Sequence, residues 1–238
     1  MVNSRHLKRY AAPRSWKIPR KTKTWAVRPH PGPHPMERSM PLIMVLRDLL
    51  HLGETASEVR KILAKREIIV DGKVRTDPKF PLGIMDTVSI PKLKDHYRVM
   101  LNPRGQISLK RIDESESGWK LARIMNKTIV KGGMMQLNLH DGRNILVGKD
   151  EYRTGDVLKI SLPDQKIVEK LPMKEESLAV LTGGAHIGTV CRIKKINVTR
   201  NPDSNIVEFH EGFNTVMEHV FVVGTKTSEI ESAEVTTI

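Results

Sequence analysis

The stretch EIIVDGKVRTDP, from Glu67 to Pro78, contains the strongest local folding signal in this chain of 238 residues. Asp71 and Gly72 separate two short apolar runs. This dipeptide favours the two-residue turn of a β-hairpin, in which both turn residues adopt a positive φ. The pattern therefore predicts paired strands at Ile68–Val70 and Lys73–Arg75.

Two helices are expected before this hairpin, because apolar residues recur there at helical spacing: Leu42, Val45, Leu46 and Leu49, then Ala56, Val59, Ile62 and Leu63. A proline precedes the first helix and Gly53 ends it. Thr55 and Glu58 form a capping box that opens the second helix, which is expected to run to about Arg66. With the hairpin and a return strand at Thr87–Ile90, these helices predict a compact α+β unit.

Beyond residue 92 the pattern changes to β-structure. LNLHDGRNILV (Leu137–Val147) predicts a second hairpin at its Asp-Gly pair, and DVLKISLPDQKIVEKL (Asp156–Leu171) alternates around a Pro-Asp turn. LAVLTGGAHIGTVCRIKKINV (Leu178–Val198) alternates again, with glycines between its two apolar parts. Turn signals at such short intervals predict small barrels.

The glycines in this last stretch stand at the spacing of a nucleotide-binding loop. Such a loop needs a lysine directly after the second glycine and then a Ser or Thr for magnesium. After Gly188 the chain has Thr189 and Val190 instead, so both chemical positions are wrong and NTPase activity is excluded. We expect the glycines to let the backbone turn sharply or approach another segment closely; the positions concerned are Gly72, Gly183, Gly184 and Gly188.

The charge of the chain predicts a polyanionic partner. Forty Lys and Arg against 27 Asp and Glu give a net charge of +13 and a pI of about 9.9. Residues 1–40 contain ten Lys or Arg and a single acid, Glu37, and so hold +9 of this total. We infer a basic segment that lies on phosphate.

The same segment contains RPHPGPHP (Arg28–Pro35), whose alternate prolines forbid a helix or a central strand. We therefore expect residues 1–40 to form an extended arm without a core of its own, disordered in the free protein and ordered on RNA. Trp16 and Trp25 lie within it. They either anchor the arm onto the folded body or stack on unpaired bases.

A second basic surface is expected on the helix that begins at Thr55. Lys61 and Lys65 are four residues apart and lie opposite the apolar stripe, with Arg60 beside them. They could form a solvated face in which Glu58 pairs with Lys61. A phosphate-facing edge is the preferred interpretation, because one glutamate cannot balance both lysines.

Membrane, metal and catalytic functions find no support in the residues. No stretch approaches the roughly 18 apolar residues of a membrane span, and the single cysteine, Cys191, excludes an internal disulfide and a four-cysteine zinc site. His30 and His34 have a metal-ligand spacing only within a helix, which the prolines forbid. Cys191 follows His186 by five residues, but nothing nearby would orient the histidine, so we expect a small half-buried thiol. We expect no cofactor, no metal and no catalysis.

Two modules in this order resemble a known family. Residues 42–90, with Ile69–Val74 as the signature, resemble the alpha-L RNA-binding module, and the segment around Gly188 resembles the KOW motif of an SH3-like barrel. Together with RHLKRYAAPRSW, GPHPMERSMPLIMVLRD, GKVRTDPKFPLGIMDTVSI, LNLHDGRN and TGGAHIG, the chain resembles the archaeal and eukaryotic type of small-subunit ribosomal protein four. Many members have a glycine where this chain has Cys191.

The resemblance implies an α+β, multi-domain protein in four parts. These are a basic N-terminal extension (1–41), an alpha-L module (42–91), a central β domain (92–174), and a KOW barrel with a short acidic tail (175–238). It implies binding of small-subunit ribosomal RNA in the cytoplasmic ribosome, beside neighbouring ribosomal proteins, with no small-molecule substrate and no membrane partner. The lack of a basic C-terminal extension favours an archaeal source.

The RNA-facing residues that the resemblance implies are mostly cations. In the extension they are Arg5, Lys8, Arg9, Arg14, Trp16, Lys17, Arg20, Lys21, Lys23, Trp25, Arg28 and Arg38. In the alpha-L module they are Arg60, Lys61, Lys65, Lys73 and Arg75, and near Gly188 they are Arg192, Lys194 and Lys195. An enzyme with an alpha-L appendage is disfavoured because no large catalytic domain follows. A non-ribosomal RNA-binding regulator or RNA-modification accessory protein remains the alternative.

Overall fold

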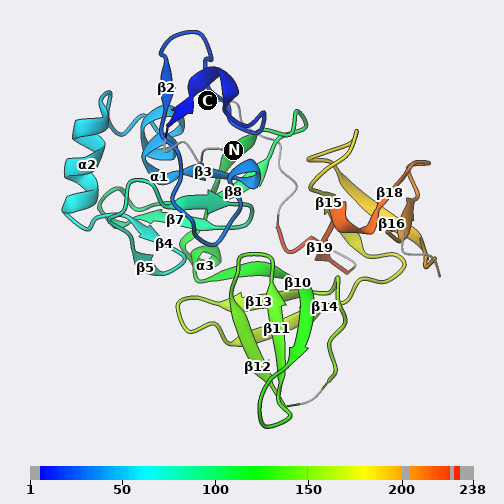
Figure 1. Ribbon diagram of the computed structural model, residues 1–238. Helices are drawn as coiled ribbons and strands as arrows, with labels where there is room; N and C mark the ends of the chain where they lie inside the picture. The colour runs from blue at the N-terminus through cyan, green and yellow to red at the C-terminus, as the bar shows by residue number, and fades with distance from the viewer. Residues whose placement is uncertain (1–5, 149, 200–203, 226–227, 231–238) are drawn as a thin grey trace. The chain divides into compact units, whose positions relative to one another are not determined.

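The computed structural model describes residues 6–148, 150–199, 204–225 and 228–230 (Figure 1). The chain divides into two compact units. Unit 1 comprises residues 1–100 and 106–118, and unit 2 comprises residues 101–105 and 119–238. The four-part division at residues 41, 91 and 174 stays a prediction.

The helices of unit 1 follow the predicted positions. Helix α1 (Leu42–Met44) continues into a wider π-helical turn at Val45–Leu49, and helix α2 covers Ala56–Ala64. The capping box is confirmed: Thr55 Oγ1 accepts from the Glu58 N–H, and the Glu58 carboxylate accepts from the Thr55 N–H. The helix ends before Arg66, because that residue adopts a left-handed φ of 59°.

The sheet of unit 1 has five strands in the order β5-β4-β7-β8-β9. Their bounds are Ile69–Val70 (β4), Lys73–Val74 (β5), Thr87–Ile90 (β7), Asp95–Leu101 (β8) and Ile107–Ile112 (β9), and a short helix α3 follows at Glu114–Ser117. The predicted hairpin is confirmed by the pairing of β4 with β5 around Asp71 (φ 50°) and Gly72 (φ 72°). The return strand β7 has the predicted bounds and pairs with β4.

The N-terminal segment differs from the expected free arm, because it packs within unit 1. Strand β1 (Leu7–Lys8) pairs with β2 (Trp25–Ala26), and β3 (Ser39–Pro41) pairs with β6 (Pro81–Gly83). Trp16 is only 1% exposed, and its Nε1–H donates to the Ser39 carbonyl at 2.6 Å. The expectation of a disordered arm is therefore wrong for the described residues 6–40.

Two arginines contribute to this packing. Prolines interrupt backbone pairing, which leaves carbonyl groups in need of other donors. The Arg20 guanidinium donates to the carbonyls of Tyr10, Ala12 and Pro13, and Arg9 Nε donates to the Pro19 carbonyl at 2.6 Å. Arg9 and Arg20, which the sequence suggested as RNA contacts, thus help to hold the N-terminal segment in its fold.

Unit 2 contains two antiparallel sheets of five strands (Figure 1). The first has the order β12-β11-β10-β13-β14, with bounds Trp119–Ile129 (β10), Met135–Leu139 (β11), Asn144–Val147 (β12), Val157–Ser161 (β13) and Ile167–Leu171 (β14). Its core comprises Ala122, Ile124, Leu137, Leu139, Leu158 and Ile160. The predicted hairpin around the second Asp-Gly pair is confirmed, since β11 pairs with β12.

The second sheet has the order β18-β17-β16-β15-β19. Its strands are Leu178–Leu181 (β15), Val190–Asn197 (β16), Ile206–Phe209 (β17), Asn214–Val216 (β18) and Val220–Gly224 (β19). Strand β15 pairs with both β16 and β19, so the first and last strands meet, as in a small barrel. Along β16, Cys191 and Ile193 are buried while Arg192 and Lys194 are exposed.

The glycines between β15 and β16 are packed against protein. Gly188 has a φ of 79°, and a Cβ there would lie 2.4 Å from the Asn102 carbonyl oxygen, within unit 2. Gly184 also has a positive φ, and a Cβ on Gly183 would lie 2.6 Å from the His219 ring. Only glycine permits approaches this close.

Candidate RNA interface

Helix α2 presents a cationic face on the side away from its core contacts. Val59 and Leu63 are buried, whereas Arg60, Lys61 and Lys65 are exposed. The side chains of these three cations have no hydrogen bond or ion pair with any residue that the structure describes. Their positive charge is therefore available to a ligand.

Glu58 does not neutralise that face. Its carboxylate accepts hydrogen bonds from the backbone N–H groups of Glu54 and Thr55 at the helix start. Hydrogen bonding, first with Thr55, lowers the pKa of Glu58, and the charge of Lys61 contributes least. The glutamate caps the helix instead of pairing with the lysine.

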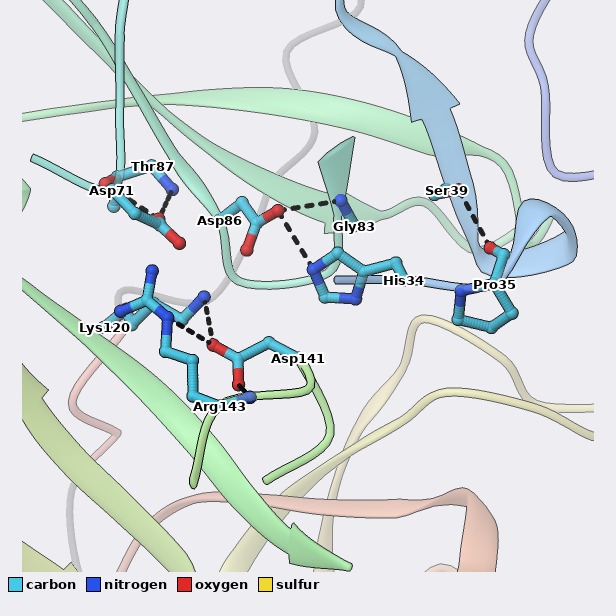
Figure 2. A network of polar contacts seen from close by, with 10 residues as sticks. All are labelled: His34, Pro35, Ser39, Asp71, Gly83, Asp86, Thr87, Lys120, Asp141 and Arg143. Atoms are coloured by element: carbon cyan, nitrogen blue, oxygen red, sulfur yellow. Dashed lines mark hydrogen bonds and ion pairs between the residues drawn. The ribbon is translucent and has the colours of Figure 1, made fainter. Parts of the chain in front are cut away.

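The β4–β5 hairpin contributes one further exposed cation. Lys73 is exposed, whereas Arg75 is half-buried with its guanidinium 4.4 Å from the centre of the Phe80 ring. The turn itself is held by the buried Asp71 carboxylate, which accepts from the Thr87 N–H at 3.0 Å (Figure 2). Of the two candidates, Lys73 is accessible to a ligand, and Arg75 packs against Phe80.

The cations of the N-terminal segment differ in their exposure to solvent. Six are exposed: Lys8, Arg14, Lys17, Lys21, Lys23 and Arg38. Arg28 is half-buried, and Arg5 lies outside the described residues. Arg9 is buried and Arg20 binds three carbonyls, so these two predicted contacts are corrected to structural roles.

The two tryptophans of this segment also separate. Trp16 is buried, so stacking on a base is wrong for it and anchoring is its role. Trp25 is 55% exposed. The alternative left open for the pair is thus decided for Trp16, whereas base stacking by Trp25 stays a prediction.

The barrel cations near Gly188 are not equivalent. Lys194 and Lys195 are exposed, but Arg192 Nη1 lies 3.5 Å from the Glu176 carboxylate. His210 Nε2 lies 2.8 Å from the same carboxylate, and its hydrogen bond is the main cause of the lowered pKa of Glu176. Glu176 therefore offsets part of the charge that Arg192 brings.

The two histidines of RPHPGPHP pair with different aspartates. His30 Nδ1 lies 2.9 Å from Asp77, whereas His34 Nε2 lies 3.0 Å from Asp86, with both side chains of the second pair 3% exposed. Asp86 also accepts from the Gly83 N–H at 3.0 Å (Figure 2). Each ring serves to dock the segment, a role that the sequence pattern did not reveal.

A buried ion cluster in unit 2 was also missed from the sequence. Lys120 Nζ lies 2.7 Å from Asp141 Oδ2, and Arg143 Nε lies 3.2 Å from the same oxygen (Figure 2). The side chains of Lys120 and Asp141 are at most 1% exposed. Lys120 and Asp141 are far apart in the sequence, so no local pattern could indicate that they form a pair.

Catalytic chemistry gains no support from the remaining titratable groups. Cys191 is buried, and burial raises the pKa of its thiol, which keeps the nucleophilic thiolate scarce. Within the described ranges, no group of three or more His, Cys, Asp or Glu side chains is placed to hold a metal ion. In the same ranges, no helix is both long and apolar enough to cross a membrane.

Comparison with known proteins places this geometry in a family. The family model described as "Ribosomal family S4e" matches residues 93–167, an RS4NT domain matches residues 1–37, and an S4 domain matches residues 40–88. The "Small ribosomal subunit protein eS4" of Methanothermobacter thermautotrophicus is 47% identical over 97% of this chain and 96% of its own length. That of Methanocaldococcus jannaschii is 44% identical, over 92% of this chain and 94% of its own.

A solved structure agrees with these relatives. The crystal structure of the 30S ribosomal protein S4e from Thermoplasma acidophilum is similar with a TM-score of 0.72 and 35% identity, covering 81% of this chain and 99% of that one. The predicted α+β, multi-domain fold class and its alpha-L (S4) module are confirmed. The KOW motif around Gly188 stays a prediction. The chain belongs to the ribosomal S4e family.

Proposed function

We propose that this protein is a structural, non-catalytic constituent of the small ribosomal subunit and binds ribosomal RNA in the cytoplasm. The exposed, unpaired cations of α2 carry this proposal, because they lie on an S4 module, a type of domain that binds RNA. The names of the eS4 relatives support the ribosomal setting.

Binding is distributed over three sets of exposed cations. The first is Lys8, Arg14, Lys17, Lys21, Lys23 and Arg38; the second is Arg60, Lys61, Lys65 and Lys73; the third is Lys194 and Lys195. Contacts to phosphate supply affinity and register without reading base sequence. Because the sets are linked in one chain, binding of one raises the effective concentration of the others.

Neighbouring ribosomal proteins are the second class of partner in this proposal. The barrel that contains Gly188 has a mixed surface, with Glu176 offsetting Arg192. A surface of both signs suits contacts with proteins as well as with RNA.

Reconstitution tests the proposal directly. The full chain is mixed with deproteinised small-subunit ribosomal RNA and, separately, with an unrelated folded RNA of equal length, and dissociation constants are measured at several salt concentrations. We expect tighter binding to the ribosomal RNA and co-sedimentation with small subunits in moderate salt. Equal binding to both RNAs, with no chain in the subunit fraction, would instead indicate the free RNA-binding regulator.

A further inference from the structure

The β1–β2 ribbon of unit 1 has two chemically different faces. Leu7 pairs with Ala26, and Lys8 pairs with Trp25. Residues directly opposite in an antiparallel pair project to the same face, and successive residues project to opposite faces. Leu7 and Ala26, which are half-buried, thus form the inner face, and the exposed Lys8 and Trp25 form the outer face.

The outer face exposes an unusual amount of aromatic surface. Trp25 is 55% exposed, and the His6 ring lies 5.5 Å from it, centre to centre, at an angle of 51°. Tyr10, just beyond β1, is 77% exposed. Burying the Trp25 side chain would remove apolar surface from water, as burial of the Trp16 side chain, which is 1% exposed, already does. The fold nevertheless leaves this indole in solvent.

The surroundings of the indole are cationic. Lys8 lies directly across the ribbon from it, and Lys21 and Lys23 are exposed in the segment that leads into β2. Lys8 has no ion pair with any residue in the described part of the chain. A ligand for this face therefore needs a planar apolar surface and a negative charge within one side-chain length of each other.

A nucleotide has both features. We propose that the outer face of the β1–β2 ribbon, formed by His6, Lys8 and Trp25, binds unpaired nucleotides, with a base stacked on Trp25 and a neighbouring phosphate at Lys8. In a duplex the faces of the bases are covered by their neighbours, so only an unpaired base can offer its face to the indole. This inference rests on the proposed function, in which RNA is the ligand, and adds a preference for single-stranded RNA at this place.

The test compares single-stranded with duplex RNA on the full chain. The probes are a short unstructured oligouridylate and a duplex of the same length, and the variants are Trp25→Ala, Trp25→Phe and Lys8→Gln. Trp25→Ala should weaken binding of the single strand about 5- to 150-fold and leave duplex binding unchanged. Trp25→Phe should keep most of the affinity, because it keeps an aromatic face. Lys8→Gln should weaken binding of the single strand and lower its salt dependence by about 0.7.

Fluorescence supplies a second, independent measure. The single strand should quench the exposed Trp25 of the wild type, and this part of the quenching should disappear in Trp25→Ala, which retains the buried Trp16 and the half-buried Trp119. Leu146→Ala is the matched control, because Leu146 is a similarly exposed apolar residue, 54%, in unit 2. This control should bind both probes as the wild type does.

The outcomes separate the inference from the proposed function. If the wild type binds ribosomal RNA but Trp25→Ala binds the single strand equally well, the nucleotide site is wrong and the proposed function stands. If Trp25→Ala retains all RNA binding but no longer joins the subunit, the ribbon contacts a protein, and the nucleotide site is again wrong. If the wild type binds no RNA, the proposed function fails as well.

Discussion

Among single residues, Gly188 lies in a close backbone approach within unit 2. It combines a φ of 79° with an Asn102 carbonyl oxygen that would lie 2.4 Å from an added Cβ. Gly188→Ala should destabilise unit 2 by about 2–4 kcal/mol, of which about 1–2 comes from the left-handed backbone and the rest from displacement of the Asn102 backbone. Chemical denaturation measures the loss.

Gly133 provides a matched control for this prediction. It has a φ of 76°, but nothing lies within 4 Å of the position of an added Cβ. Gly133→Ala should therefore cost only the backbone share, about 1–2 kcal/mol. Equal losses for the two variants would mean that the contact with Asn102 contributes nothing.

ATP should leave the melting temperature of the wild type unchanged, since Thr189 stands where the phosphate-binding loop needs a lysine.

Asp141 links stability to pH at the residue scale. Burial would raise the pKa of Asp141, but the charges of Lys120, His140 and Arg143 outweigh it and hold that pKa below its ordinary value. The carboxylate thus stabilises the fold above the unfolded pKa of about 3.9, and this stabilisation is lost as the pH falls through the lower folded pKa. Asp141→Asn should cost about 3–5 kcal/mol at neutral pH, because it leaves a buried lysine uncompensated.

The pH dependence of that cost is the decisive measurement. Urea denaturation of wild type and Asp141→Asn should show a difference that narrows as the pH is lowered below about 4. A difference that stays constant with pH would show that the carboxylate charge is not what stabilises the hairpin.

Among the elements, α2 separates folding from binding most cleanly. Val59 and Leu63 hold the helix to unit 1, while Lys61 and Lys65 point to solvent. The double variant Lys61→Glu with Lys65→Glu should keep its stability within about 0.5 kcal/mol. It should bind ribosomal RNA more weakly and lower the slope of log affinity against log salt by about 1.4–1.8.

A matched double variant controls for net charge. Lys131 and Lys166 are exposed in unit 2, and changing both to Glu alters the total charge of the protein by the same amount. If both double variants weaken binding equally, only the overall charge matters and α2 is not an RNA-facing element. Loss of cooperative unfolding in the α2 variant would instead contradict the assignment of its exposed face.

At the scale of the whole molecule, the N-terminal segment belongs to the fold and, in the proposed function, also to the binding surface. Deleting residues 1–38 removes the buried Trp16, so it should lower the melting temperature; loss of a buried tryptophan side chain costs about 3–5 kcal/mol. Changing Lys17, Lys21 and Lys23 to Gln should keep the melting temperature, since all three are exposed. It should lower the slope of log affinity against log salt by about 2.1–2.7. Unchanged melting of the truncated chain would restore the interpretation of a free arm.

Local chemistry made several parts of this protein predictable from the sequence. The turn at Asp71 and Gly72, the capping box of Thr55 and Glu58, and the strand at Thr87–Ile90 all depend on residues a few positions apart. Each signal needs only backbone geometry or a hydrogen bond within one turn, so it survives without knowledge of the rest of the chain. The basic composition likewise indicated a polyanionic partner without any coordinates.

Tertiary structure alone decided which of the basic and aromatic residues remain accessible. Trp16 and Trp25 are the same residue type in similar basic sequence surroundings. Trp16 is nevertheless buried and donates a hydrogen bond to the distant Ser39 carbonyl, whereas Trp25 is exposed. Arg9 and Arg20 donate hydrogen bonds to backbone carbonyls of the proline-rich segment, whereas the nearby lysines are exposed to solvent. Sequence determines the charge and shape of each side chain, but its burial depends on partners many residues away, which only the folded chain brings within hydrogen-bonding distance.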